Sequence, residues 1–128
     1  MPAVTIFYPK DFFGPEEKES FGRNVKSSVA TYMDAINPIT GQMTDYASDP
    51  DKFIGLLLIP YDPYDAELTA PFLATIVTYD WPDRMTNIGS RIAAITERVQ
   101  SCIPRNRVPA GQKTISFTFV AAGGWHSA

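Results

Sequence analysis

Apolar residues along this chain fall into short continuous runs and longer stretches with helical spacing, in an order that repeats. The run Val4–Tyr8 is β-branched and aromatic and predicts a first strand. From Pro15, apolar residues recur every three or four positions and acidic residues follow the proline, which predicts a helix over residues 15–34. Phe53–Ile59 is apolar throughout, as expected of a strand that is buried on both faces.

The second half of the chain repeats this pattern. A strand is expected over residues 72–80, and Ile88–Cys102 keeps an alternating four- and three-residue apolar spacing that predicts a helix. Ile115–Val120 alternates between apolar and polar positions and predicts a half-buried strand. Residues 38–51, between the first helix and the second strand, are polar and rich in turn formers, which predicts a long loop.

Sliding the chain along itself by 70 residues superposes the two patterns. Thr5–Phe7 then falls on Thr75–Val77, and the apolar positions of the two helices coincide. Parallel strands joined through a helix need a right-handed crossover. We therefore expect an α+β fold in which two tandem β-α-β units form a four-stranded sheet with both helices on one face. One domain over residues 1–128 is expected, with pseudo-repeat halves at about 1–65 and 66–128.

The other face of such a sheet would still need a cover. Phe53–Ile59 is apolar at consecutive positions, so both faces of that strand call for burial. A neighbouring subunit could supply the cover, since symmetric association is the common way to bury such a face.

Composition and charge narrow the possible partners. The 11 basic and 14 acidic residues give a net charge of −3, so neither nucleic acid nor an anionic membrane is expected as a partner. Cys102 is the single cysteine, which excludes an intramolecular disulfide, and its place on a helical apolar stripe favours a buried, inert thiol. With no membrane-spanning run and no visible signal peptide, a cytoplasmic location is expected.

Few residues offer catalytic chemistry. His126 is the only histidine, so a histidine-based triad or paired-histidine zinc site is excluded, and we expect no metal and no cofactor. Methionine before a small residue is commonly removed, which would leave Pro2 with a free secondary amine. An α-amino group has a pKa of ~7.7–8.0, and partial burial lowers it, because desolvation disfavours the charged form. Pro2 is therefore a candidate general base.

Three stretches of the chain carry a resemblance to a known family. They are the opening PAVTIFYPKDFFGPEEKESFGRNV, the segment TIVTYDWPDRMTNIGSRI and the ending FVAAGGWHSA. Together with Pro2 at the start of a duplicated β-α-β pattern, they resemble the tautomerase superfamily, which includes 4-oxalocrotonate tautomerase, macrophage migration inhibitory factor and malonate semialdehyde decarboxylase. The resemblance covers nearly the whole chain. The arginine that the family pattern has after the first strand is replaced by KDFFG, and the loop over residues 38–51 is longer than usual.

The resemblance implies a homotrimer with Pro2 pockets between subunits. It also implies that Pro2 and Arg84 are the catalytic residues, with Arg84 on the substrate carboxylate. Substrate-binding roles are implied for five further residues: Trp125, Tyr79 and Phe7 as an apolar wall, Lys52 as a cation and Ser116 as a polar group. The alternatives are that Arg84 is a surface charge beside a helix start and that Trp125 packs as part of the tail. A retained Met1 would turn the amine of Pro2 into an amide and remove the base.

Three functions remain open at this point. The first is a tautomerase or isomerase in which Pro2 acts as general base on a small carboxylated keto or enol substrate. The second is a decarboxylase or hydratase of a small 3-oxo or unsaturated acid, with protonated Pro2 as general acid. The third is a non-catalytic trimeric interaction protein on the same fold.

Overall fold

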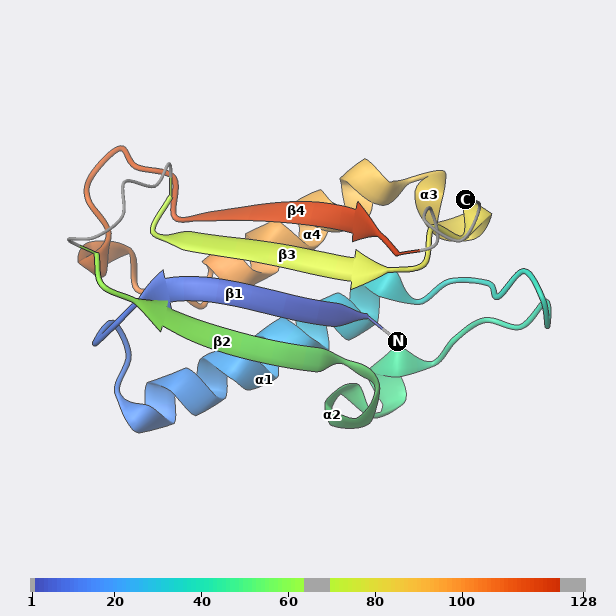
Figure 1. Cartoon of the computed structure of the whole chain (residues 1–128), viewed down its shortest axis with the longest axis horizontal. Helices are drawn as coiled ribbons and strands as arrows, with labels where there is room; N and C mark the ends of the chain where they lie inside the picture. Colours follow the sequence, from blue (N-terminus) through green and yellow to red (C-terminus); the bar gives the residue numbers. More distant parts are fainter. Residues whose placement is uncertain (1, 64–69, 123–128) are drawn as a thin grey trace.

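Two parallel strand pairs meet in one four-stranded sheet (Figure 1). In the computed structural model, which describes residues 2–63 and 70–122, β1 (Ala3–Pro9) pairs in parallel with β2 (Gly55–Tyr61). β3 (Phe72–Thr78) pairs in parallel with β4 (Ile115–Ala121). β1 and β3 pair antiparallel at the centre, which gives the strand order β2-β1-β3-β4.

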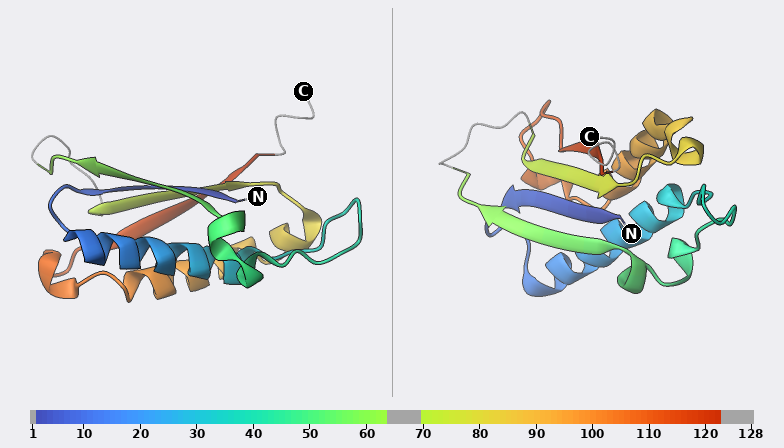
Figure 2. Two further views of the ribbon diagram at one scale, coloured as in Figure 1. Left: turned by 90° about the horizontal axis from the view of Figure 1, so that it is seen from below. Right: turned by 45° about the vertical axis from the view of Figure 1, so that its right-hand side comes forward.

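Two long helices, α1 (Pro15–Met33) and α4 (Ile88–Gln100), lie side by side on one face of this sheet, as Figure 2 shows from below. The predicted α+β architecture is confirmed. The short helices are α2 (Pro50–Phe53), α3 (Pro82–Met85) and the 3₁₀ turns η1 (Tyr46–Ser48) and η2 (Arg105–Arg107). Among the described residues, no helix is long and apolar enough to cross a membrane.

Positions 70 residues apart take equivalent places in the core. Three such pairs are fully buried between the sheet and the helices: Ile6 with Ile76, Val25 with Ile95, and Val29 with Val99. Burial of one such aliphatic side chain contributes about 1.5–3 kcal/mol. The apolar pattern of each half therefore serves the same core.

The second strand differs from the prediction at both ends. Asp49 accepts a hydrogen bond from the backbone of Lys52 at 3.3 Å, and Pro50 occupies the first helical position, so a short helix takes up Phe53 before the strand starts. The strand then continues through Pro60, because β2 is an edge strand, where a residue without an N–H is tolerated.

The face of the sheet opposite the helices is open in the single chain. Alternate strand residues point to it, and Leu57, Phe7 and Val120 are 56%, 41% and 43% exposed there. The predicted burial of the second strand on both faces is therefore not met within one chain. Whatever covers this face has to come from outside the described residues.

The predicted loop over residues 38–51 has more structure than expected. Ile36 and Met43 form an isolated antiparallel bridge, which makes a small hairpin directly after α1. The hairpin turn contains Gly41 with φ of 71°, a left-handed conformation that suits glycine. The segment then passes through η1 and α2 into β2.

Candidate active site

Pro2 enters the sheet at the start of its first central strand. Its carbonyl oxygen accepts a hydrogen bond from the backbone N–H of Gly55 at 3.0 Å, and the residue is buried. Ala3 lies opposite Val77 in the antiparallel pairing, so continuing the register by one residue sets Pro2 opposite Thr78. The residue is thus held between the start of β2 and the end of β3.

Arg84, the second predicted catalytic residue, is fully buried, so the surface-charge alternative is wrong. Its Nε and Nη2 donate to the carbonyl oxygen of Met33 at 3.2 and 2.8 Å. Its Nη1 donates to Thr78 Oγ1 at 3.3 Å and to the carbonyl oxygen of Tyr79 at 2.6 Å. The guanidinium carbon lies 5.0 Å from the centre of the Trp81 ring, a cation–π distance.

These contacts direct the guanidinium toward its own chain. Burial lowers the pKa of the Arg84 guanidinium, and Tyr46 and Asp34 oppose that decrease. Its hydrogen bonds go to carbonyl and hydroxyl oxygens, and the ion pairs found between described residues do not include it. A substrate carboxylate could reach Arg84 only if some of these hydrogen bonds broke, so the geometry gives the predicted carboxylate contact no support.

A second arginine, Arg91, which sequence reasoning missed, binds carbonyl oxygens at the end of α1 as Arg84 does. Arg91 Nη1 donates to the carbonyl oxygens of Tyr32 at 2.8 Å and Asp34 at 2.6 Å. The last carbonyls of a helix have no partner within the helix, and α1 has no basic residue in its own last turn. Arg84 and Arg91, from the second β-α-β unit, supply donors to the last two of these carbonyls, those of Met33 and Tyr32.

Lys52 and Tyr79 lie at the same end of the sheet as Pro2. Lys52 belongs to α2, which leads directly into β2, and its exposed ammonium group lies 5.2 Å from the centre of the Phe53 ring. Tyr79 follows β3, is 43% exposed and stacks on Trp81 with ring centres 6.1 Å apart. The structure therefore brings Pro2, Lys52 and Tyr79 to one end of the sheet.

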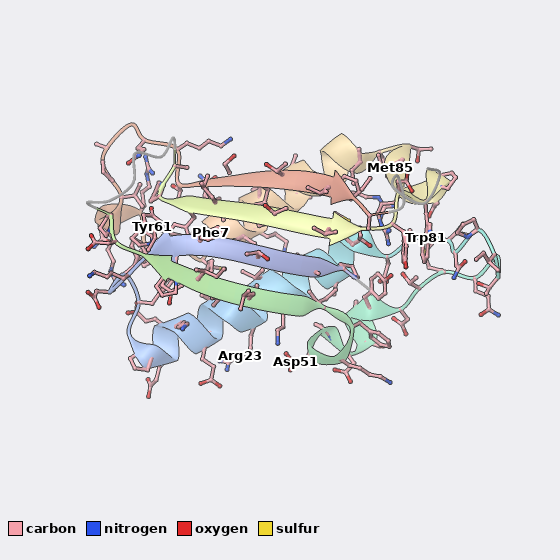
Figure 3. The ribbon with its side chains drawn as sticks, viewed as in Figure 1. Phe7, Arg23, Asp51, Tyr61, Trp81 and Met85 are labelled. Atoms are coloured by element: carbon pink, nitrogen blue, oxygen red, sulfur yellow. The ribbon has the colours of Figure 1, made fainter. Side chains whose placement is uncertain are left out.

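Phe7 and Ser116 lie toward the opposite end. Phe7 is five positions along the strand from Pro2, which is roughly 16 Å at about 3.3 Å per residue. Phe7 pairs with Leu73 and Leu73 with Ser116, so the two predicted substrate-binding residues share one row of the sheet. Figure 3 shows Phe7 toward one end and Trp81 at the other. Within one chain, Phe7 and Ser116 cannot line a pocket together with Pro2.

Solved structures share this arrangement of elements. A fused 4-oxalocrotonate tautomerase, described as a wild-type asymmetric trimer, covers 93% of this chain and 86% of its own, with a TM-score of 0.59 and 9% identity. FG41 malonate semialdehyde decarboxylase inhibited by 3-bromopropiolate gives a TM-score of 0.55, 17% identity and coverage of 96% and 86%. The chain has the tautomerase fold.

A third structure, a probable enzyme from the thermophilic fungus Aspergillus fumigatus, covers 95% of this chain and 76% of its own, with a TM-score of 0.57 and 12% identity. No protein-family model and no curated protein matches the chain. The resemblance seen in the sequence is thus confirmed for the tautomerase fold, while Trp125, one of its predicted wall residues, lies outside the described residues.

On this tautomerase fold, a large hollow of the described surface lies away from Pro2. It measures about 1030 Å³ and runs between α4 and β4, where Ile92, Cys102 and Phe117 line it. Cys102 is only partly buried at this hollow, not buried as predicted, and its sulfur donates to the carbonyl oxygen of Arg98 at 3.4 Å. Among the described residues, no cluster of three or more histidine, cysteine or acidic residues could hold a metal ion.

Tyr46 is a further residue near Arg84 that the sequence did not point to. It is 7% exposed, and its ring centre lies 5.9 Å from that of Phe53. Its only signal in the sequence was that it is the one aromatic residue of the segment 38–51. In this tautomerase fold, it connects Arg84 with the helix that precedes β2.

Proposed function

We propose that this protein is a small-molecule tautomerase or isomerase that uses the amine of Pro2, freed by removal of Met1, as a general base. The observation that supports this is the placement of Pro2 in a tautomerase fold. It is buried at the start of a central strand, and Gly55 fixes its carbonyl oxygen. A small carboxylated keto or enol compound is the proposed substrate.

The proposed reaction moves one proton. The neutral amine of Pro2 takes a proton from the carbon next to a carbonyl group or, in ketonisation, from the enol hydroxyl. The electrons of the broken C–H or O–H bond form an enolate, and the new ammonium returns the proton to another carbon or to oxygen. Burial favours the neutral amine at working pH, since desolvation disfavours the ammonium form. The proton and the electron pair are conserved, so the step needs no other reactant.

For the substrate carboxylate, the contacts favour Lys52 over Arg84. Lys52 is exposed on the short helix that leads into β2, next to the strand end that holds Pro2. Arg84 already donates to three residues of its own chain and is fully buried. We therefore assign the carboxylate contact to Lys52 and give Arg84 a structural role, which is to join the end of α1 to the end of β3.

The proposed active form is a homotrimer in which a neighbouring chain completes the site. The fused 4-oxalocrotonate tautomerase structure that the chain resembles is described as a trimer. The open sheet face carries exposed Leu57, Phe7 and Val120, which call for a cover. A second chain could also bring Phe7 and Ser116 to a Pro2 pocket that one chain cannot build alone.

Processing of the N-terminus gives the sharpest test. The purified protein should begin at Pro2 by intact mass, and it should ketonise phenylenolpyruvate or 2-hydroxymuconate. A matched protein with one alanine added before Pro2 should lose at least ~100-fold in kcat/KM, because an amide nitrogen cannot accept the proton. The kcat/KM of the processed protein should rise with pH at a midpoint below the ~7.7–8.0 of an ordinary α-amino group. Equal turnover by the extended protein would refute the proposal.

A decarboxylase is the second candidate, because the malonate semialdehyde decarboxylase structure covers 96% of this chain. In that reaction, protonated Pro2 would act as general acid on a small 3-oxo acid. Release of CO₂ from such an acid, without turnover of enol pyruvates, would favour it. A processed, trimeric protein that is inactive on both substrate classes would leave the third alternative, an interaction protein.

A further inference from the structure

A small hairpin projects past the end of the sheet, next to the end that holds Pro2 (Figures 1 and 2). We call residues 35–44 the arm. Its two sides meet in the Ile36–Met43 bridge. Across its turn, the N–H of Asn37 donates to the carbonyl oxygen of Gln42 at 2.9 Å, and the N–H of Gly41 donates to that of Asn37 at 2.8 Å. The arm is therefore a formed hairpin.

The base of the arm is fixed to the rest of the chain. Asp34 Oδ1 accepts hydrogen bonds from Thr44 Oγ1 at 2.6 Å and from the backbone N–H of Tyr46 at 2.7 Å. Asp83 Oδ2, in α3, accepts one from the N–H of Ile36 at 2.8 Å. Held from both sides, the arm presents its outer residues away from its own chain.

Those outer residues are apolar. Ile39 is 92% exposed, Met43 59% and Ile36 41%. No residue of the arm is charged, although 20% of the chain is. Met85 of the neighbouring α3 adds a further exposed apolar side chain, at 37%. An ordered, uncharged protrusion with apolar side chains of this size marks an interaction surface.

We propose that the arm docks on a second copy of this chain, against the open sheet face. This inference rests on the homotrimer proposed above and adds a contact to it. The positions that the strand register places on the open face carry no charged side chain: Ala3, Thr5, Phe7, Pro9, Gly55, Leu57, Ile59, Tyr61, Leu73, Thr75, Val77, Ser116, Thr118 and Val120.

On the helical side of the molecule, the outer surface of α1 suits the arm poorly. The outer surface of α1 carries exposed Glu16, Glu19 and Arg23, whose charges would lose water without gaining a partner under an apolar arm. The sheet face, by contrast, matches the arm in both charge and apolar character. The fixed base keeps the arm away from the sheet face of its own chain, so the matching surface has to belong to another copy.

Self-association of full-length variants tests the arm separately from the trimer. The double variant Ile39→Ser/Met43→Ser removes the apolar tip, and Thr40→Ser, which keeps its hydroxyl at the same turn, is the matched control. In sedimentation equilibrium, we expect the double variant to associate at least ~10-fold more weakly than the wild type, and Thr40→Ser to match the wild type. Because both replaced side chains are exposed, the urea midpoint of the dissociated chain should not change.

Two outcomes would overturn the inference. Unchanged association of the double variant, while Leu57→Asp on the sheet face yields monomers, would leave the trimer and refute the arm contact. A wild-type chain that stays monomeric would refute both. As a direct readout, a benzoylphenylalanine at position 39 should cross-link to sheet-face peptides of another chain, shown by mixing isotope-labelled and unlabelled protein. Adducts within one chain alone would also refute the contact.

Discussion

At the scale of single residues, the sequence and the structure assign different roles to Arg84. Arg84 stands at a strand-to-helix turn, where the sequence predicts a ligand contact. The partner that decides its role is the carbonyl oxygen of Met33, 51 residues away in the chain. Pattern analysis finds the cation but not the acceptors, because these are brought together only by packing of the two β-α-β units.

A hydrophobic replacement separates the two roles of Arg84. Arg84→Met should lower the free energy of unfolding by roughly 2–4 kcal/mol, since the carbonyl oxygens of Met33 and Tyr79 lose their donors inside the core. Arg23→Met removes an exposed ion pair with Glu19 and should cost less than ~0.5 kcal/mol. Urea unfolding measures both. If Arg84→Met kept the stability of the wild type and lost only activity, the carboxylate role predicted from the sequence would be restored.

At the scale of elements, periodicity located the long helices and the strands of residues 2–63 and 70–122, and local side-chain chemistry decided where each one ends. The start of α1 at Pro15 could be predicted from the sequence, because proline and acidic residues mark it. The start of β2 was predicted too early, because Asp49 and Pro50 begin a short helix that ends at Phe53. Strand geometry sets Phe7 about 16 Å from Pro2 of the same chain, so Phe7 could line a Pro2 pocket only from a neighbouring subunit. The sequence predicted which strand or helix each residue belongs to better than it predicted the distances between candidate site residues.

The first turn of α1 predicts a measurable pH dependence. The hydrogen bond from the Gly14 N–H lowers the pKa of Glu17 below its usual 4.5, while burial opposes this decrease. The guanidinium of Arg107, which lies 3.0 Å from Glu17 Oε2, lowers the pKa further. A lowered carboxyl pKa stabilises the fold above the unfolded-state value, and this contribution disappears as the pH falls through the folded-state value.

The free energy of unfolding of Glu17→Gln should accordingly decrease less than that of the wild type between pH 5 and about pH 3, as measured by urea titration at each pH. Glu16→Gln is the control, since no hydrogen bond or ion pair links Glu16 with another described residue in this turn. Parallel pH curves for wild type and Glu17→Gln would show that the lowered pKa has no effect on folding.

At the scale of the whole molecule, the helices cover one sheet face and leave the other apolar and open. The repeat in the sequence predicted this layering, because equivalent positions of both halves bury the same face. It could not show what covers the second face, since that depends on another molecule. Oligomerisation is the property of the fold that remains a prediction.

A charge on the open face tests the proposed trimer. Leu57→Asp places a carboxylate where the proposed interface excludes water, so we expect it to yield monomers at concentrations where the wild type is trimeric, as measured by sedimentation velocity. Ser20→Asp adds the same charge to the exposed side of α1 and should leave assembly unchanged. A trimer that tolerates Leu57→Asp would place the interface on another surface.

The arginine cap on α1 also bears on the order of events in folding. Helix ends normally fray, so their amides exchange with solvent through small local openings. Here the carbonyl oxygens of Tyr32 and Met33, the last two residues of α1, accept hydrogen bonds from Arg91 and Arg84 of the other unit. That turn should then open only when the two units separate. Amides of residues 30–33 should exchange with deuterium as slowly as those of the central strands, so that a helix terminus would report on unfolding of the entire chain.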